Sequence, residues 1–248
     1  MSRKIEIGNL SKSFTSRSGS IQVLKEISFE VFEKEFLVIL GPGGCGKTTL
    51  LKIIVGELGF DEGRVNIRGG KNIGFVFQSF SIFPWMTVHQ NVEFGLKMRN
   101  VPEQERREIT SKYIDLVGLK GFEGYYPKQI SGGMKQRVGI ARMLAISPEI
   151  MLMDNPFGHL DAQTKYHLEE ELLRIWDAER KTVVFVTNDI EEAIFLADRI
   201  ILLSKLPAEI KEQFEVSFQR RGPNGELLRR SRTGDKFLKL RKTLTEVF

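Results

Sequence analysis

The chain has 248 residues, of which 41% are hydrophobic and 28% charged, and its formal net charge is +5. This length allows one large domain or two small ones, and the composition is that of a globular protein rather than a disordered or fibrous one. The apolar runs are strand-sized, far below the ~20 residues that span a bilayer, and the N-terminus lacks the apolar core of a signal peptide. A single cysteine excludes an internal disulfide, so we expect a cytoplasmic protein.

The positive charge is concentrated near the end of the chain. Residues 205–248 contain 11 Lys and Arg against 6 Asp and Glu, so the preceding 204 residues are neutral overall. A uniformly basic nucleic-acid surface is therefore not supported. Two readings of the basic tail stay open: a solvated polar face, or a patch near anionic lipid headgroups or a partner.

Strands and turns predominate in the first third of the chain. β-Branched and aromatic residues predict strands at 4–7, 23–31, 36–40, 64–67 and 72–77. The spacing of Leu and Ile predicts a helix over 48–58, after a Gly-rich loop.

Helices predominate in the middle of the chain, and strands and helices then alternate. Thr87 and Gln90 form a capping box that predicts a helix to about Arg99, and a second helix is expected from Pro102 to Gly118. The remaining predictions are strands at 149–154, 182–187 and 199–204, helices at 162–179 and 190–197, a hairpin-like turn at 221–225 and a short helix near 237–244.

Apolar strands that alternate with helices predict an α/β fold with a mainly parallel sheet, helices on both faces and ligands at the carboxyl ends of the strands. A helical insert interrupts this pattern. We therefore expect one composite domain over 1–248, with a core at about 1–86 and 146–205, a helical subdomain at about 87–145 and a basic tail at about 206–248.

GPGGCGKT at 41–48 matches the phosphate-binding pattern G-x-x-x-x-G-K-[ST] and lies between a predicted strand and a predicted helix. Its glycines are expected to take positive φ and turn backbone N–H groups toward a phosphate, where the helix dipole adds to the attraction. Lys47 is expected to bridge the terminal phosphates, and the Thr48 hydroxyl to bind Mg²⁺. The predicted set is Gly41, Gly43, Gly44, Cys45, Gly46, Lys47, Thr48 and Thr49, with Cys45 read as a small filler rather than a reactive thiol.

Two further segments carry site residues. The apolar run 150–153 ends in Asp154, which is expected to hold Mg²⁺ through water at the end of a neighbouring strand. ISGGMKQR at 130–137 places Ser131, Gly132 and Gly133 at a helix start, which is an anion-binding N-terminus if it is not simply a Gly turn. In a head-to-tail pair, each chain's Ser-Gly-Gly would close over the other chain's nucleotide.

The P-loop, Gln78 after NIGFVF, ISGGMKQR, IMLMD and the GHLD turn occur in the order of the ATP-binding cassette (ABC) ATPases, and the resemblance covers about residues 1–205. SKSF, VFQSFSIFPWMTVHQNV and FVTNDIEEAIFLADRI are most similar to ATPase subunits of nitrate, sulfonate and taurine importers. The resemblance implies the ABC ATPase fold: a P-loop NTPase core with a mixed sheet, an N-terminal antiparallel β subdomain and an inserted helical subdomain.

The resemblance also implies roles for single residues. Phe14 would stack on adenine, unless it is a core aromatic. Gln78 would touch Mg²⁺ and the attacking water, and would begin the loop to Trp85 that meets the transmembrane permease. In that loop Phe80, Phe83, Pro84 and Trp85 look exposed, although a core-filling role is the alternative. Asp161 would face the dimer partner.

Two positions depart from the family pattern. Asn155 stands where the general base Glu is expected, and Asn188 where the switch His is expected. An amide cannot accept a proton from water, and general-base catalysis is typically worth ~10²–10⁴-fold, roughly 3–5 kcal/mol. We therefore expect nucleotide binding to persist and hydrolysis to be weak. Slow turnover through other groups, or deliberate trapping substitutions, are the alternatives; His159 would point across the dimer and does not replace the switch.

The resulting hypothesis is an ATP-binding subunit on the inner face of the membrane, which binds ATP with Mg²⁺ and drives a permease served by a solute-binding protein. The solute would be a small anion or sulfonate-like molecule. The impaired site favours a heterodimer with a complete second ATPase subunit over a homodimer. Alternatives are a nucleotide-sensing regulator and a non-transport ABC protein acting on nucleic acid or ribosomes, which usually has coiled-coil inserts or two cassettes.

Overall fold

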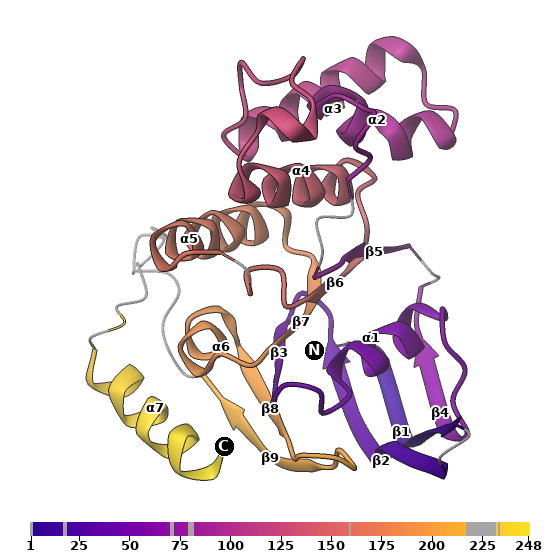
Figure 1. Cartoon of the computed structure of the whole chain (residues 1–248), viewed down its shortest axis with the longest axis vertical. Helices are drawn as coiled ribbons and strands as arrows, with labels where there is room; N and C mark the ends of the chain where they lie inside the picture. Colours follow the sequence, from indigo (N-terminus) through magenta and orange to yellow (C-terminus); the bar gives the residue numbers. More distant parts are fainter. Residues whose placement is uncertain are drawn as a thin grey trace. The chain divides into compact units, whose positions relative to one another are not determined.

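The computed structural model describes residues 2–16, 19–69, 72–78, 82–158, 160–216, 232 and 234–248. The chain divides into two compact units, which we call unit 1 (Met1–Lys71 and Thr182–Phe248) and unit 2 (Asn72–Lys181). Figure 1 labels the helices and strands. None of the helices in the described ranges is both long enough and apolar enough to span a bilayer.

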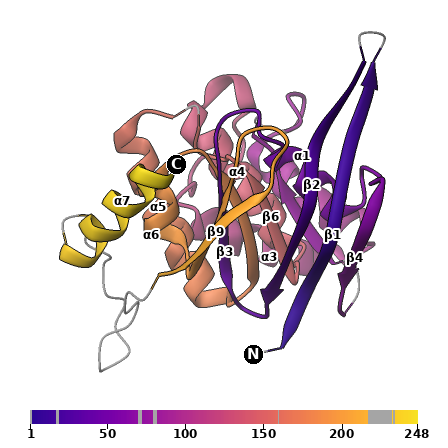
Figure 2. The ribbon, with the colours of Figure 1, turned by 90° about the horizontal axis from the view of Figure 1, so that it is seen from below.

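Unit 1 contains an antiparallel sheet in the order β2-β1-β4. Its strands are β1 (Arg3–Ser16), β2 (Gly19–Phe32) and β4 (Glu62–Ile67). β1 and β2 form a long hairpin that extends well beyond β4 (Figure 2). Near its tip Phe14 pairs with Ile21 across the two strands, so both side chains are held by backbone pairing at an exposed edge.

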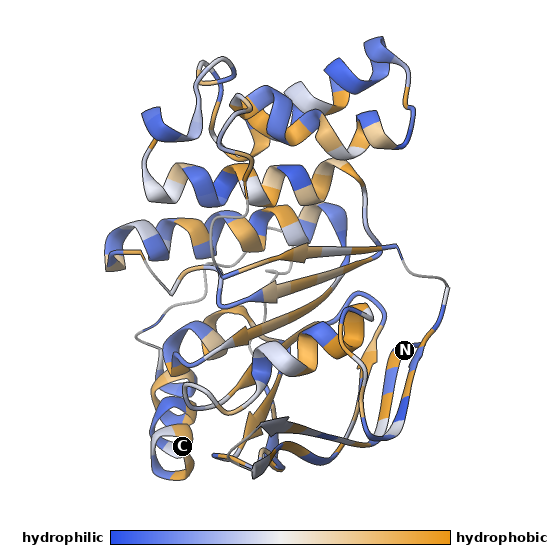
Figure 3. Cartoon of the chain, turned by 45° about the vertical axis from the view of Figure 1, so that its right-hand side comes forward, coloured by the Kyte–Doolittle hydropathy of each residue, from blue (hydrophilic) through white to orange (hydrophobic). Residues whose placement is uncertain are grey.

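The second sheet of unit 1 is built on a fully buried central strand. β3 (Phe36–Leu40) pairs in parallel with β7 (Thr182–Thr187) and β8 (Arg199–Leu203), and β9 (Ile210–Glu215) pairs antiparallel with β8. Every residue of β3 and β7 is buried, which explains their continuous apolar sequences, and the sheet strands are mostly orange in Figure 3.

The described residues of unit 1 form three helices. α1 (Lys47–Val55) contacts β7, and α6 (Ile190–Leu196) contacts β3 and β7. α7 (Asp235–Val247) packs against α6 and buries Phe237 and Leu244. The loops that leave the carboxyl ends of β3 and β7 lead directly into α1 and α6.

Unit 2 pairs β5 (Ile73–Val76) in parallel with β6 (Ile150–Asp154). Its helices are α2 (Val88–Met98), α3 (Glu103–Leu116), α4 (Gly132–Ala145) and α5 (Ala162–Glu179), with a short 3₁₀ turn at Pro127–Gln129. α4 contacts β5 and each of the other three helices, and Figure 1 shows it between α5 and the α2–α3 pair. The predicted Thr87–Gln90 capping box is present at the start of α2.

The strands at 36–40 and 182–187 and the helix at 162–179 match their predicted bounds, and the short helix predicted near 237–244 is α7. β9 was not predicted. The hairpin-like turn predicted at 221–225 lies outside the described residues. The subdomain limits expected from the sequence stay a prediction.

Candidate functional site

The Gly-rich loop at 41–46 joins β3 to α1 in unit 1. Gly44 and Gly46 have φ of 76° and 105°, which glycine adopts without strain. Gly41 and Gly43 do not have positive φ, so the prediction of positive φ at all four glycines is wrong for these two. A Cβ on Gly41 would lie 2.9 Å from Sγ of Cys45. Gly41 is therefore needed for close packing rather than for its φ.

The first turn of α1 follows this loop and has no side-chain cap. Such a helix N-terminus presents backbone N–H groups to an anion. A Cβ on Gly43 or Gly44 would meet no atom within 4 Å, so the approach to this turn is open. Thr48 is exposed and Thr49 half-buried. The loop is thus a cradle that fits a phosphate.

Lys47 is buried beneath the loop. Its ammonium group donates hydrogen bonds to the carbonyl oxygens of Gly41 at 2.6 Å and Pro42 at 2.8 Å, and it lies 3.8 Å from the thiol of Cys45. Cys45 is itself 2% exposed, which fits the role of a small filler. Lys47 is thus held at the loop that it is expected to share with a phosphate.

The structure brings Asn188 beside the Gly-rich loop. The backbone N–H of Gly41 donates to the carbonyl of Thr187 at 3.3 Å, so the loops that follow β3 and β7 start side by side. Asn188 is exposed. The next residue, Asp189, caps α6 by accepting from the N–H of Glu192 at 3.1 Å, which fixes the direction in which the loop leaves the sheet.

Phe14 lies near the tip of the β1–β2 hairpin and is 43% exposed, which excludes the core-aromatic alternative. The ammonium group of Lys12 lies 5.5 Å from the centre of its ring. An exposed aromatic ring of this kind offers a flat face to a base.

In unit 2, three of the predicted residues lie at the carboxyl ends of two paired strands. Val76 of β5 lies opposite Met153 of β6, so Gln78 and Asn155 each stand two residues beyond the paired position. Asp154 is the last residue of β6 and is 5% exposed, whereas Gln78 is exposed. The carboxyl edge of this strand pair therefore carries one buried carboxylate and two amides.

The predicted Ser-Gly-Gly segment begins α4 in unit 2. Ser131 is the N-cap and accepts from the N–H of Met134 at 3.2 Å. A Cβ on Gly133 would lie 2.7 Å from the methyl carbon of Thr164 in the first turn of α5. Asp161 caps α5, and the hydrogen bond from the N–H of Thr164 holds the pKa of its carboxyl below the ordinary value. Ser131 and Asp161 thus lie at the starts of α4 and α5, and these two helix starts contact each other.

The loop before α2 carries aromatic residues, of which Trp85 is 69% exposed. Phe83 is only half-buried rather than exposed as expected, because its ring contacts Phe94 and the guanidinium of Arg142. Phe80, in the same loop, and His159 lie outside the described residues. The exposed end of this loop remains a candidate contact surface.

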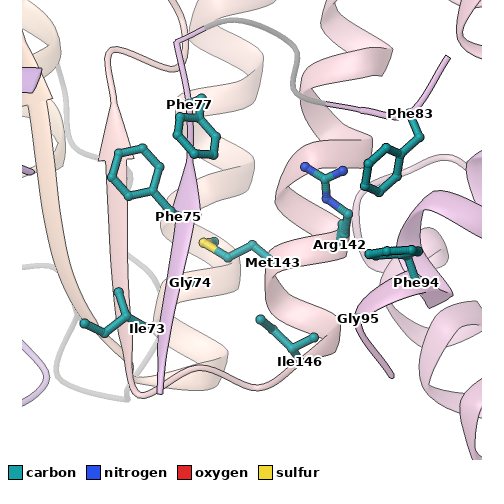
Figure 4. Close-up of a pocket in the computed structure, with 10 residues that line it drawn as sticks. All are labelled: Ile73, Gly74, Phe75, Phe77, Phe83, Phe94, Gly95, Arg142, Met143 and Ile146. Atoms are coloured by element: carbon teal, nitrogen blue, oxygen red, sulfur yellow. The ribbon is translucent and has the colours of Figure 1, made fainter. Parts of the chain in front are cut away.

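A largely apolar cavity of about 370 Å³ lies next to this loop. Figure 4 shows its lining, in which the Arg142 guanidinium lies beside the ring of Phe83. Burial lowers the pKa of Arg142 below its ordinary value, and its cation is the charged group among the lining residues. The full lining is Ile73, Gly74, Phe75, Phe77, Phe83, Phe94, Gly95, Arg142, Met143 and Ile146.

Sequence reasoning missed the residue that fixes this loop. Asn91 of α2 is fully buried, accepts from the N–H of Phe83 at 2.7 Å and donates to the carbonyls of Phe83, Met86 and Thr87. The sequence does carry a signal for Asn91, because a polar residue stands there at an apolar position of the helix, beside Val88 and Val92.

Comparison with known proteins gives the family. The ABC transporter family model matches residues 24–158. An uncharacterized ABC transporter ATP-binding protein of Methanocaldococcus jannaschii is 46% identical over 253 residues, covering 100% of this chain and 92% of the relative. The aliphatic sulfonates import ATP-binding protein of Bacillus cereus is 40% identical, covering 98% and 95%. The nitrate import ATP-binding protein of Synechocystis sp. is 44% identical, covering 86% and 82%.

The structure is similar to solved ABC cassettes. The dimeric post-hydrolysis state of the ATP-binding cassette MJ0796 bound to ADP and Pi has a TM-score of 0.77 and 33% identity, covering 87% of this chain and 100% of that chain. The match confirms the α/β fold predicted from the resemblance, with its mixed and antiparallel sheets. The family model matches more than half of the sequence, and the relatives align over nearly its whole length. The chain therefore belongs to the ABC transporter family.

Proposed function

We propose that this chain is the ATP-binding subunit of an importer for a small anion or sulfonate-like solute, and that its own hydrolytic site is impaired. Two amides carry the second part of the proposal: Asn155 follows the buried Asp154, and Asn188 follows β7 beside the P-loop. Neither side chain can accept a proton from water near neutral pH.

The residues of the P-loop fit ATP. The open first turn of α1 and the backbone around Gly44 would hold its phosphates, with Lys47 moving from the loop carbonyls to the terminal phosphates. Phe14 would stack on adenine. Thr48, Gln78 and Asp154 would hold Mg²⁺, which binds through few protein ligands and keeps several waters. When bound, the ion supplies positive charge that offsets the negative charge of the phosphates.

The same amides favour a heterodimer. In a head-to-tail pair, the glycines after Ser131 would close over a partner's nucleotide, while this chain's own pocket would hold ATP as a clamp. A second ATPase subunit with a complete site would then supply most of the turnover. A homodimer remains the alternative.

The aromatic loop and the cavity beside it support permease docking within unit 2. Trp85 is strongly exposed, and the apolar cavity is lined in part by the half-buried Arg142. A cytoplasmic permease segment with apolar side chains would complement this surface. We place the subunit on the cytoplasmic face of the membrane for this reason. The relatives named for sulfonate and nitrate import support the class of solute.

The deciding experiment measures binding and turnover separately. Calorimetry of the purified chain with ATP and Mg²⁺ should give saturable binding at micromolar to millimolar ATP, and phosphate release should be far slower than in a relative with both catalytic groups. Asn155→Glu with Asn188→His should raise the rate. Lys47→Ala is the control that removes binding. Brisk turnover by the native chain would overturn the impaired-site proposal.

Permease docking has its own test. Trp85→Ala should reduce co-purification with the permease and leave ATP affinity unchanged, whereas Phe60→Ala, which removes a 40% exposed aromatic in unit 1, should change neither. The two amides also favour a nucleotide-sensing regulator as a second candidate. A chain that binds ATP and never co-purifies with a permease would support the regulator.

A further inference from the structure

The loop after β7 is closed by a ring of three hydrogen bonds around Asn188. The N–H of Asp189 donates to Oγ1 of Thr187 at 3.0 Å, and the N–H of Glu192 donates to Oδ1 of Asp189 at 3.1 Å. The hydroxyl of Thr187 in turn donates to Oε2 of Glu192. The residues on both sides of Asn188 are thus tied to one another, while Asn188 itself is exposed.

Thr187 is the central member of this ring. Its side chain is fully buried, and Glu192 is only 1% exposed. A hydroxyl has one hydrogen to donate. Because the Thr187 oxygen accepts from the N–H of Asp189, that hydrogen is directed to Glu192. A buried carboxylate is costly without hydrogen-bond donors, so the ring resists opening.

Thr187 also joins this loop to the P-loop. The N–H of Gly41 donates to the Thr187 carbonyl at 3.3 Å, and Thr187 pairs with Leu40, the last residue of β3. Thr187 is therefore bonded to the P-loop through its backbone and to the Asn188 loop through its side chain. The position of Asn188 relative to the P-loop follows from these two attachments.

The outer side of the loop is open. A cavity of about 430 Å³ is lined by residues 188–191 and by Arg241 and Thr245 of α7. The guanidinium of Arg241 donates to Oε1 of Glu191 at 2.9 Å, and both side chains are exposed. Since α7 borders the loop across a cavity, the hydrogen-bond ring on the buried side holds position 188.

We propose that Thr187 is a positioning residue for position 188: its hydroxyl, directed to Glu192, holds the loop so that the side chain at 188 reaches the terminal phosphate of ATP. This rests on the proposed function, in which position 188 faces the nucleotide. An amide there can donate a hydrogen bond to a γ-phosphate oxygen, which ATP has and ADP lacks. Thr187 should therefore favour ATP over ADP, although its own side chain is buried within the loop.

The test is calorimetry of ATP and of ADP, each with Mg²⁺, on the native chain, Thr187→Val, Asn188→Ala and the double variant. Valine has the shape of threonine but can neither accept from Asp189 nor donate to Glu192. We expect each single variant to bind ATP about tenfold more weakly, as for one hydrogen bond to a charged group, and ADP within twofold of native. The double variant should bind ATP no more weakly than Asn188→Ala, because both changes remove the same contact.

The matched control is Thr182→Val, at the other end of the same strand. Thr182 is 3% exposed, and its Oγ1 accepts from the N–H of Lys34 at 3.0 Å, so this variant also loses a buried hydroxyl that is bonded to a backbone N–H. Its ratio of ATP to ADP affinity should stay native. Thr187→Ser keeps the hydroxyl and should keep the ratio, which tests the proposal even where Thr187→Val does not fold.

Four results would overturn the positioning role: additive losses in the double variant, equal losses for ATP and ADP in Thr187→Val, a tenfold loss for ATP in Thr187→Ser, or native ATP affinity in Asn188→Ala. Failure of the proposed function has a different signature. Absent ATP binding by the native chain would overturn both proposals, whereas brisk turnover by the native chain would overturn only the impaired site.

Discussion

Replacing Asn91 by Leu tests what holds the loop from Phe83 to Thr87. The variant removes one hydrogen bond accepted from Phe83 N–H and three donated to backbone carbonyls, each worth about 1 kcal/mol net, or about 4 kcal/mol together. Burial of the leucine side chain returns roughly 2 kcal/mol. The free energy of unfolding should therefore fall by about 2 kcal/mol. The melting temperature should fall by about 4–8 °C, at roughly 2–4 °C per kcal/mol for a chain of this size.

The assay is urea unfolding followed by circular dichroism, with calorimetry of ATP binding on the same sample. ATP affinity should be retained, because the P-loop belongs to unit 1, whereas co-purification with the permease should decrease. Asn66→Leu, on an exposed position of β4, is the control and should change stability by less than about 0.5 kcal/mol. A loss below about 1 kcal/mol in Asn91→Leu would refute the assigned role of these hydrogen bonds.

Three further substitutions test the nucleotide pocket and the charge network. Gly46→Ala should weaken ATP binding at least tenfold, because φ is 105° and the new Cβ would lie 2.7 Å from Val23 Cγ1; native affinity by calorimetry would contradict this. Phe14→Ala should weaken ATP binding about tenfold, since stacking is worth ~1–3 kcal/mol, and an unchanged Kd would remove Phe14 from the site. The hydrogen bonds from Lys12 and from Ser13 N–H lower the pKa of Asp61, so this carboxylate stabilises the fold above its unfolded pKa and loses that contribution as pH falls through the folded value. Asp61→Asn should be less stable than native at pH 7, and the difference should vanish in acid; a constant difference across pH would be inconsistent.

The sequence predicted the elements whose signals are local. β3 and β7 are continuous apolar runs, and α5 begins at Asp161, whose carboxylate caps it. β9 was missed because only Ile210 and Phe214 in it are even partly buried. It is a strand because it pairs with β8, which is a tertiary cause that no window of sequence contains.

The candidate site was predicted in composition but not in detail. The residues of the P-loop were identified by pattern, yet the pattern did not distinguish Gly41, which packs against Cys45, from Gly46, which needs positive φ. The N–H of Gly158 donates to the carbonyl of Asn155 at 3.2 Å and closes the turn after β6. Such contacts follow from three-dimensional packing rather than from residue type and spacing.

The contact between Gly133 and Thr164 has a mechanical consequence. The first turns of α4 and α5 touch where there is no room for one added methyl group. A side chain larger than hydrogen at position 133 would therefore push the two turns apart, and with them the capping residues Ser131 and Asp161.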